Sequence, residues 1–383
     1  MASIGIICEY NPFHNGHLYH INKTKEMFPN SPIILIMSGN FTQRGIPSII
    51  NKWEKTKLAL QYGVDLVIEL PFVFASQSAD IFAKGSIQLL KELKVSDIVF
   101  GSESNNVDDF INLANIQLNS KEYDKNVKKY LDKGINYPTA MSKALKDISN
   151  VFVASPNDLL GLSYTKEIIK QNANINIHPI KRTVGYHDII ENNNFASASL
   201  IRNKLLNNEN ISNLVPYKSN NIIKNTNLHF TNNYFNLLKY KILTDSQIEK
   251  YQTVDEGIEN RIYKYIIKSE SIDDLINNIK TKRYTYNKIQ RMLTHILCGF
   301  TKEEAANINN EYIRILGFSN IGKKYLNTIK KELTLPIIFN YKKNISKILD
   351  IEFRTTCVYA SILKEKDKIN LIEKEIKEKP FQL

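Results

Sequence analysis

Two histidines, His14 and His17, lie on either side of Gly16 in the segment Glu9–His17 (EYNPFHNGH), directly after the apolar run Ile4–Cys8. A helix that starts near Gly16 would point its free backbone N–H groups toward the end of that run, and such a helix start is a binding site for anions. Glycine lets a phosphate approach the backbone closely. Two imidazoles can donate to phosphate oxygens as negative charge develops on them. The pattern therefore predicts a site for chemistry on phosphoryl groups.

A metal site is the alternative for this segment. His14, His17 and His20 are spaced by three residues each, but no carboxylate or thiolate cluster accompanies them, so the sequence predicts no metal ligands. The other alternative is that both histidines are ordinary surface or core residues. That reading is disfavoured, because two of the chain's seven histidines bracket one glycine after the first apolar run.

A second anion-binding element is predicted at residues 196–202 (ASASLIR). Ser199 is expected to cap the helix that begins here. Arg202 is expected in its first turn, where a guanidinium can hold a leaving pyrophosphate. A capped helix with an arginine is common, so this segment alone is weak evidence for an anion site. The prediction is stronger because the segment follows the histidine pair in the same chain.

The hydrophobic pattern of the first 200 residues predicts the scaffold for both elements. The apolar runs predicted as strands are Ile4–Cys8, Ile33–Met37, Leu66–Leu70, Asp97–Phe100 and Ile175–Ile180. The helices predicted between them are His17–Met27, Asn51–Tyr62, Ser78–Leu93 and Leu159–Lys170. Near-continuous apolar strands separated by helices predict an α/β fold with a parallel sheet covered on both faces. In such sheets ligands bind at the carboxyl ends of the strands.

Other segments of the chain do not follow this alternation of apolar strands and helices. Residues 121–150 are predicted to form a polar helical insertion. We expect a catalytic domain over 1–205, an Asn- and Lys-rich linker over 206–230, and a mainly helical basic domain over 231–383. The tail, 364–379, alternates Lys and Glu, which predicts a solvated helix.

Charge separates the two halves of the chain. Residues 1–202 carry 21 Lys and Arg against 19 Asp and Glu, whereas residues 203–383 carry 30 against 20. A nearly neutral first half beside a basic second half indicates a catalytic domain followed by one that binds a polyanion. The alternative is that the many Lys, Asn and Ile residues reflect an AT-biased genome.

Cysteines and apolar runs exclude several protein classes. Cys8, Cys298 and Cys357 lie far apart, which indicates neither a disulfide framework nor a zinc site and fits a reducing cytosol. The N-terminal apolar run is five residues long, lacks a basic flank and ends at Glu9, unlike a signal peptide. No stretch approaches the roughly 20 apolar residues of a membrane helix. The sequence predicts a cytoplasmic protein.

The HNGH motif after a first strand resembles the HxGH signature of the HIGH nucleotidyltransferase superfamily, whose catalytic domain is a Rossmann-like parallel sheet. The segment ASASLIR resembles its ISSTxIR element, with Ala198 in place of one serine. Seven longer blocks, from residue 4 to about 293, together resemble the tRNA(Met) cytidine acetate ligase family. They are IGIICEYNPFHNGHLYHI, MSGNFTQRGIPSIINKW, ELPFVFASQSADIFAKG, FGSES, SPNDLLGLSY, IKRTVGYHD and KRYTYNKIQRML.

The resemblance implies a reaction. The family uses ATP, with Mg²⁺, and acetate to form acetyl-adenylate, and moves the acetyl group to N4 of the wobble cytidine of elongator tRNA(Met). By the resemblance, the catalytic residues are His14, His17 and Arg202. The implied ATP contacts are Ile7, Cys8, Glu9, Tyr10, Asn11, Pro12, Phe13, His14, Asn15, Gly16, His17, Leu18, Tyr19, His20, Gly101, Asn157, Arg182 and Ser199.

Three of these ATP contacts have plausible structural alternatives. Gly101 ends a strand, where adenosine can press against the backbone, or it simply makes a turn. Asn157 stands at a helix start, where it can read a ribose or base edge, or it caps the helix. Arg182 follows Lys181 after the fifth strand, where both can neutralise phosphates, or they form a solvated basic pair.

The segment Thr281–Arg291 carries the candidate RNA contacts. Cations can meet phosphates while a tyrosine stacks on an unpaired base. The predicted RNA-binding residues are Lys282, Arg283, Lys288 and Arg291, interleaved with Tyr284 and Tyr286. The alternative is an amphipathic helix with a basic face and buried tyrosines. We predict no stable protein partner.

Two rival functions remain open at this point. A cofactor adenylyltransferase would share the HxGH and Arg202 elements but leaves the basic C-terminal half without a role. A non-catalytic tRNA-binding protein with a degenerate nucleotide domain would explain the charge, but an intact HNGH disfavours it.

Overall fold

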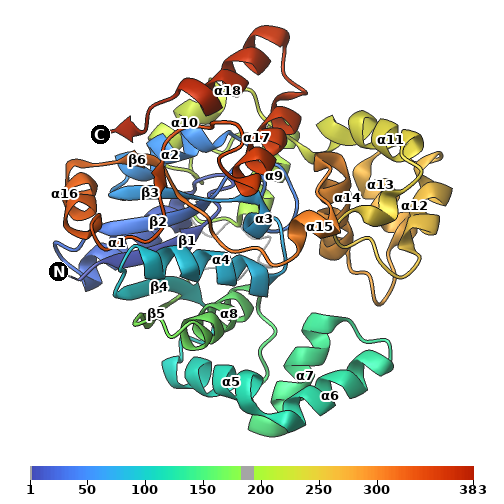
Figure 1. The fold of residues 1–383 in the computed structure, drawn as a ribbon, viewed down its shortest axis with the longest axis horizontal. Helices are drawn as coiled ribbons and strands as arrows, with labels where there is room; N and C mark the ends of the chain where they lie inside the picture. Colours follow the sequence, from blue (N-terminus) through green and yellow to red (C-terminus); the bar gives the residue numbers. More distant parts are fainter. Residues whose placement is uncertain (1, 183–193) are drawn as a thin grey trace.

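The computed structural model describes residues 2–182 and 194–383, and its centre is a sheet with flanking helices (Figure 1). The strands are β1 (Ile4–Cys8), β2 (Ile33–Ser38), β3 (Leu66–Leu70), β4 (Asp97–Ser102), β5 (Asn176–Lys181), β6 (Ile313–Phe318), β7 (Ile337–Ile338) and β8 (Phe381–Gln382). The helices of the first part are α1 (Asn15–Met27), α2 (Lys52–Gln61), α3 (Phe72–Ala75), α4 (Ala79–Glu92), α5 (Val107–Asn119), α6 (Lys121–Asp132), α7 (Tyr137–Ser149), α8 (Pro156–Lys170), α9 (Ala198–Leu206) and α10 (Tyr217–Lys224). Those that follow are α11 (Phe235–Thr244), α12 (Ile258–Ile266), α13 (Ile272–Ile279), α14 (Tyr286–Cys298), α15 (Lys302–Ala305), α16 (Asn320–Ile329), α17 (Lys347–Ala360) and α18 (Glu365–Lys377).

The first five strands form a parallel sheet in the order β5-β4-β1-β2-β3. All residues of β2 and β3 are buried, which explains why these strands read as near-continuous apolar runs, with Glu69 as the charged residue in β3. The predicted α/β fold is confirmed, and the five predicted strands lie within one or two residues of the observed ones. Because β1 pairs with both β2 and β4, the chain reverses its winding direction at β1. The loop after β1, which carries HNGH, therefore lies at the switch point of the sheet.

Later segments extend the same sheet. Strand β6 pairs antiparallel with β3, and β7 and β8 both pair with β6. Side chains from Tyr312 to Leu371 belong to the main hydrophobic core, whereas those from Phe235 to Ile296 form a separate core cluster. The block expected as one helical domain over 231–383 is thus divided. Its first part is the α11–α14 block on the right of Figure 1, and its last part completes the sheet.

The segment expected as a linker, 206–230, packs closely on the catalytic part. Ile211, Leu214 and Val215 are each less than 5% exposed. The Leu214 carbonyl accepts a hydrogen bond from the Asn15 N–H, and the Ser219 hydroxyl donates to the Phe13 carbonyl. The segment therefore supports the start of α1.

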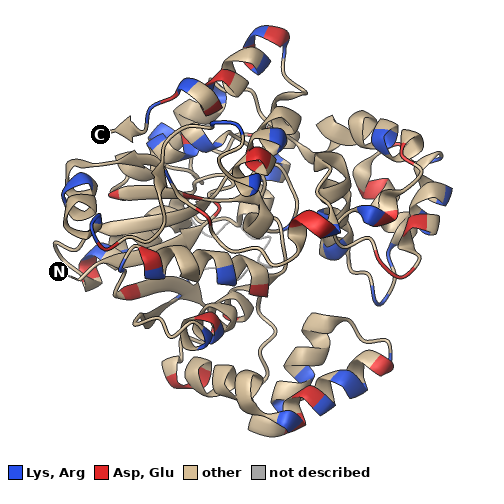
Figure 2. Ribbon diagram, viewed as in Figure 1, with Lys and Arg blue, Asp and Glu red and all other residues tan. Residues whose placement is uncertain are grey.

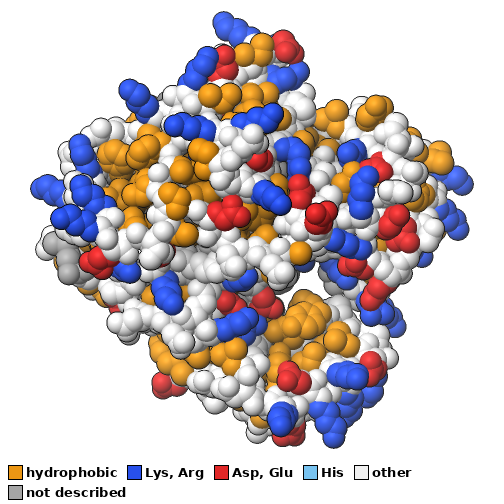
Figure 3. Space-filling model, in the orientation of Figure 1, with side chains coloured by type: hydrophobic (Ala, Val, Ile, Leu, Met, Phe, Trp, Pro, Cys, Tyr) orange, Lys and Arg blue, Asp and Glu red, His pale blue; other side chains and the backbone are white. Residues whose placement is uncertain are grey.

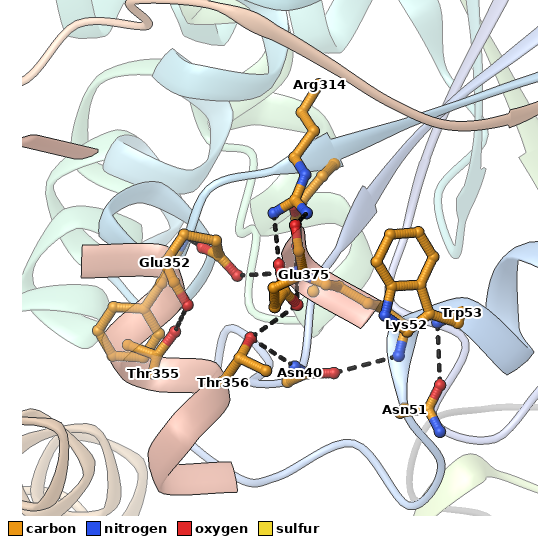
Figure 4. Close-up of polar contacts among 12 residues, drawn as sticks. Asn40, Asn51, Lys52, Trp53, Arg314, Glu352, Thr355, Thr356 and Glu375 are labelled. Carbon is orange, nitrogen blue, oxygen red and sulfur yellow. Dashed lines mark hydrogen bonds and ion pairs between the residues drawn. The ribbon is translucent and has the colours of Figure 1, made fainter. Parts of the chain in front are cut away.

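A buried ion cluster joins the C-terminal part to the sheet (Figure 4). The Lys52 ammonium of α2 lies 2.6 Å from a Glu69 oxygen and 2.7 Å from a Glu375 oxygen. The Arg314 guanidinium lies 3.0 Å from Glu69 and 2.7 Å from Glu375. Glu352 lies 3.7 Å from Lys52 and accepts a hydrogen bond from the Phe72 N–H. None of the five charged side chains is more than 2% exposed.

Two cations face three carboxyl groups in this cluster, and one carboxyl stays protonated. Burial and the neighbouring Glu69 raise the pKa of Glu352 to about 8, so this residue is neutral at pH 7. The Arg314 and Lys52 charges lower the pKa of Glu375 to about 2 despite its burial. The cluster is therefore electrically balanced. Its dependence on Glu375 also corrects one expectation: helix α18 is solvated on one face only, because Leu371 and Glu375 are buried.

Two further properties of the fold concern the distribution of its charges and the apolarity of its helices. Figure 2 shows Lys and Arg interspersed with Asp and Glu on most helices, so in this view the positive excess is not gathered on one element. Among the described residues, no helix combines the length and apolarity needed to cross a membrane.

Replacing Arg314 with methionine tests the cluster. Arg314→Met leaves carboxylates buried without their cation, which should lower the free energy of unfolding by about 3–5 kcal/mol. The measurement is urea denaturation at pH 7. The control is Lys368→Met, which breaks an exposed pair with Glu365 and should cost less than about 1 kcal/mol. Equal effects of the two substitutions would contradict the proposed role of the cluster.

Candidate active site

A cavity of about 550 Å³ lies at the carboxyl ends of the parallel strands. It is lined by residues of the loop after β1, the start of α1, the loop after β2, and helices α4, α7, α8, α9 and α14. His14 and His17 both face it, as do Arg202 and Arg182. The predicted convergence of the two phosphate elements on one crevice is therefore present in the geometry.

The two histidines are fixed by the start of helix α1. His14 is the N-cap residue, and its Nδ1 accepts a hydrogen bond from the Gly16 N–H at 3.0 Å. The His17 Nδ1 accepts one from the His14 N–H at 3.2 Å. The two rings stack with their centroids 3.8 Å apart. Because both Nδ1 atoms act as acceptors, the proton of each neutral ring sits on Nε2.

Burial keeps both rings neutral. It lowers the pKa of His14 to about 3, with Arg182 and Arg202 adding to the effect. Burial and the neighbouring His14 hold the pKa of His17 well below its ordinary value. At pH 7 each ring therefore offers one neutral Nε2–H donor. Such a donor can bond a phosphate oxygen without carrying a charge of its own.

The expectation of free N–H groups at the start of α1 is corrected by the structure. The Gly16 N–H is taken by the His14 ring, the Asn15 N–H by the Leu214 carbonyl, and the His17 N–H by the His14 carbonyl. A capped helix has few donors left for a ligand. The imidazoles thus take over the role that the sequence suggested for the backbone.

Helix α9 supplies the main cation, with two corrections to its predicted start. Ser197, not Ser199, is the N-cap, and its side chain accepts from the Leu200 N–H. Because α9 begins at Ala198, Arg202 lies in the second turn. Its guanidinium donates to the Asn11 carbonyl at 2.6 Å and to the Ser199 hydroxyl at 3.1 Å. Arg202 is thereby held against the loop after β1.

The loop after β1 is held by a buried lysine that sequence reasoning missed. The Lys55 amino group of α2 donates to the carbonyls of Glu9, Ser38 and Gly39 and contacts the Ser48 hydroxyl, all within 3.0 Å. It therefore ties the ends of β1 and β2 together. Burial lowers the pKa of Lys55 to about 7. A lysine in a mixed helix gives no sequence signal for such a role, because its partners lie in other segments.

The opposite wall of the cavity is organised around Glu103. Its Oε1 accepts from the Asn157 side chain at 2.6 Å and lies 3.7 Å from the Arg182 Nε. The Arg182 side chain lies over Gly101, where a Cβ would meet it at 3.4 Å. Asp158 holds this loop by accepting from the backbone N–H groups of Glu103 and Ser104 at 3.0 Å. Residues 183–188, which complete the IKRTVGYHD block, lie outside the described residues.

Most of the predicted ATP contacts line the cavity. Those that do are Ile7, Cys8, Glu9, Tyr10, Asn11, His14, Gly16, His17, Tyr19, His20, Gly101, Asn157, Arg182 and Ser199. Those that do not are Pro12, Phe13, Asn15 and Leu18. Phe13 is fully buried in the main core, so it shapes the loop from behind. Burial raises the pKa of the Cys8 thiol to about 12, which leaves it protonated and unsuited to act as a nucleophile.

Comparisons with known proteins agree with this geometry. A model of the HIGH Nucleotidyl Transferase family matches residues 1–374. The tRNA(Met) cytidine acetate ligase of Anoxybacillus flavithermus is 40% identical over 100% of both chains, and that of Clostridium novyi is 41% identical over 95% of this chain and 96% of its own. The chain belongs to the tRNA(Met) cytidine acetate ligase family.

Solved structures of this ligase family share the whole fold. Apo Thermotoga maritima TmcAL is 31% identical and matches over 100% of both chains with a TM-score of 0.92. The form of that protein bound with alpha-thio ATP matches over the same coverage with a TM-score of 0.89.

The ligase-family block KRYTYNKIQRML places its cations in different settings. Arg291 lines the cavity. Arg283 is 62% exposed and pairs with Glu256 at 2.7 Å, and the Lys288 ammonium lies 3.9 Å from the Tyr284 ring centroid. Lys282 is exposed. Burial lowers the pKa of Lys288, and the charges of Arg283 and Arg291 add to this effect, so these three cations lie near one another.

The two tyrosines of this block are engaged within the protein. Tyr284 is buried, and its hydroxyl donates to the Asp255 carbonyl. Tyr286 is partly exposed, and its hydroxyl donates to Asp273. Of the two, only Tyr286 leaves ring surface open to a base.

Arg291 reaches the cavity because α14 packs on the loop after β2. The Gly45 carbonyl accepts hydrogen bonds from the side chains of Gln290 and Thr294. Gly45 has φ +73°, and a Cβ there would lie 2.6 Å from the Arg291 Cα, so only glycine fits. Burial lowers the pKa of Arg291 to about 10, and the nearby Arg44 adds to this effect, so Arg291 stays charged at pH 7.

The histidine geometry predicts a titration result. In the ligand-free protein, His14 and His17 should stay in the neutral Nε2–H form from pH 8 down to pH 5, because burial penalises a second proton. Two-dimensional ¹⁵N–¹H spectra of the imidazoles, assigned with His14→Asn and His17→Gln variants, would check this. The urea-unfolded chain is the control, since its histidines should titrate near pH 6.5. Titration of either ring near pH 6.5 in the folded protein would contradict the capped geometry.

Proposed function

We propose that this chain is a ligase that uses ATP and acetate to form acetyl-adenylate, and then acetylates N4 of the wobble cytidine of elongator tRNA(Met). The observation that carries the proposal is the pair of stacked imidazoles, which present neutral Nε2–H groups to a cavity that Arg202 also lines. Full-length relatives named tRNA(Met) cytidine acetate ligase, at about 40% identity, support the same reaction.

The first step needs positioning and charge compensation rather than a covalent intermediate. An acetate oxygen attacks the α-phosphorus of ATP, and the bond to the pyrophosphate oxygen breaks. His14 and His17 stabilise the charge on the phosphoryl oxygens, and Arg202 holds the departing pyrophosphate. Burial and the nearby Arg44 lower the pKa of Arg202 to about 10, so it remains a cation at pH 7 and favours the pyrophosphate anion.

The second step transfers the acetyl group. The N4 amine of cytidine attacks the acetyl carbonyl carbon, AMP leaves with the electron pair of the broken C–O bond, and the nitrogen loses one proton. We assign no acid or base to this step. The wobble base must leave its stack, which is easiest in a single-stranded anticodon loop.

Magnesium is proposed to arrive with the triphosphate. Among the described residues there is no group of three or more His, Cys, Asp or Glu side chains arranged to hold a metal ion. Mg²⁺ is commonly held by substrate phosphates, water and one or two carboxylates, and Glu9 is a carboxylate that lines the cavity. When bound, Mg²⁺ would neutralise part of the triphosphate charge.

We also propose that the protein works in the cytoplasm, where its tRNA substrate is found.

The experiment that tests the whole reaction is mass spectrometry of tRNA incubated with the protein, ATP and isotopically labelled acetate. The expected product is one labelled acetyl group on the wobble cytidine. Acetate-dependent exchange of labelled pyrophosphate into ATP measures the first step alone. Exchange that requires a phosphorylated vitamin in place of acetate would favour a cofactor adenylyltransferase, and the proposal would fall.

Substitutions of the two histidines test their role. His14→Asn retains a helix cap but removes the imidazole donor, and His17→Gln removes the other ring. Each should lower the rate of acetate-dependent exchange by about 10²–10³-fold, the usual cost of losing one such donor. The control is His178→Gln, because His178 lies on β5 outside the cavity lining. Unchanged exchange in both variants would exclude a catalytic role, and loss of tRNA binding alone would favour a binding protein.

Salt dependence tests the proposed RNA contacts. The affinity for tRNA should fall as salt rises, because Lys and Arg release counterions from phosphates. Removing the exposed cation Arg283 by Arg283→Ala should reduce the slope of log K against log salt by about 1 if it contacts a phosphate. Filter binding between about 50 and 200 mM salt would measure it. A flat response would mean that the basic excess of residues 203–383 does not serve RNA binding.

A further inference from the structure

The cavity continues past the residues assigned to ATP. Beyond Asn157 its wall is formed by Gln117 of α5, Tyr137 and Met141 of α7, and Leu160 of α8. None of these four residues is among the proposed ATP contacts. We call the part of the cavity that these residues line the insertion chamber. Its wall is largely built by the helices inserted between β4 and α8.

The insertion chamber contains a buried amide that the protein does not fully satisfy. Neither the Oε1 nor the Nε2 of Gln117 is exposed, and the Tyr123 hydroxyl of α6 interacts with this amide. One hydroxyl cannot satisfy both ends of an amide, and a buried polar end without a partner costs free energy. The side chain lines the cavity, so a bound molecule can supply the missing partners. An amide offers a donor and an acceptor side by side, which complements the edge of a nucleobase.

The mouth of the chamber carries an exposed aromatic ring. Tyr137 is 51% exposed although it lines the cavity. Figure 3 shows hydrophobic side chains gathered on the part of the insertion that faces the α11–α14 block across a hollow in the surface. The far wall of the cavity is made by Thr285, Asn287 and Arg291 of that block. An aromatic ring and a cation that line the same cavity suit a single-stranded nucleic acid, since bases stack on aromatic rings and phosphates pair with arginine.

The insertion packs without joining the sheet. Helix α5 packs on α8, and α7 packs on α5 and α6. The phosphate elements, in contrast, come from the loop after β1 and from α9. The insertion can therefore serve a second substrate without being needed to hold the first.

We propose that the insertion chamber binds the unpaired pyrimidine base that receives the acyl group. Tyr137 stacks on this base, and the Gln117 amide donates to its N3 and accepts from one N4–H. This inference rests on the proposed function and adds the site of the acceptor. Such a pose satisfies both ends of the amide and leaves the face of the N4 amine open to the acyl-adenylate.

Two half-reactions, measured separately, test the proposal. Tyr137→Ala and Gln117→Leu should each lower the second-order rate constant of acetyl transfer to tRNA by about tenfold, the scale of one lost stacking contact or base hydrogen bond. Acetate-dependent pyrophosphate exchange, which involves no RNA, should stay within about twofold of wild type. Tyr137→Phe keeps the ring and should keep transfer near the wild-type rate. Phe152→Ala is the matched control, because Phe152 is exposed to the same degree but lies outside the cavity lining.

Several outcomes would overturn the inference. Equal losses of exchange and transfer in Tyr137→Ala would assign the chamber to acetate or ATP. Equal loss of transfer in Phe152→Ala would indicate general damage to the insertion. Unchanged transfer in both chamber variants would exclude base binding there. If the wild-type protein itself shows neither exchange nor transfer with acetate, the proposed function fails, which is a different result from an active enzyme that tolerates Tyr137→Ala.

Discussion

Two buried lysines one turn apart on α2 set the constraint on which the site depends. A buried ammonium is costly unless oxygens surround it, and the chain meets this demand differently at the two positions. Lys52 is paired with carboxylates of β3 and α18, while Lys55 is bonded to carbonyls at the ends of β1 and β2. The first arrangement fixes the C-terminal helices on the sheet. The second fixes the loops that line the cavity.

Short chains of hydrogen bonds connect the segments that these lysines hold to other parts of the structure, including Arg202. The Lys52 N–H donates to the Asn40 side chain, which in turn donates to the Thr356 hydroxyl (Figure 4). Asn11, two residues after Glu9, bonds the Ile49 N–H with its side chain and Arg202 with its carbonyl. Arg202, the cation proposed to hold the leaving group, is thus anchored to a loop that Lys55 anchors to the sheet. Such preorganisation lowers the cost of arranging charges when the transition state forms.

The site is built to receive negative charge, because the cations that line it outnumber the carboxylates; the cations are Arg44, Lys181, Arg182, Arg202 and Arg291, and the carboxylates are Glu9 and Asp80. The two imidazoles are neutral donors because they are buried, and Glu9 offsets the charge of Arg202. Arg291, which comes from the α11–α14 block, adds a cation only because α14 packs on the loop at Gly45. The helical block is therefore part of the cavity wall, in addition to carrying the proposed RNA contacts. This dual placement explains how a fold used for nucleotidyl transfer can present an activated acyl group to a large nucleic acid.

The sequence alone determined the parallel sheet, the position of HNGH after β1 and the family, because these depend on local patterns. Near-continuous apolar runs mark buried strands wherever the rest of the chain lies, and HNGH and ASASLIR are contiguous. Helix starts were harder to predict: the sequence pointed to Ser199 as the cap of α9, and the backbone geometry places the cap at Ser197.

Only the tertiary structure decided which charges are buried. Glu375 lies in an alternating Lys and Glu tail that is typical of solvated helices, and Arg314 lies in a short run within a block predicted to be helical. Their burial depends on Lys52 and Glu69, more than 240 residues away. The burial of Lys55 and of the Gln117 amide, and the place of Arg291 in the cavity wall, likewise depend on segments that are distant in the sequence. A side chain's chemistry follows from its type, but its partners and its exposure are set by segments that meet only when the chain folds.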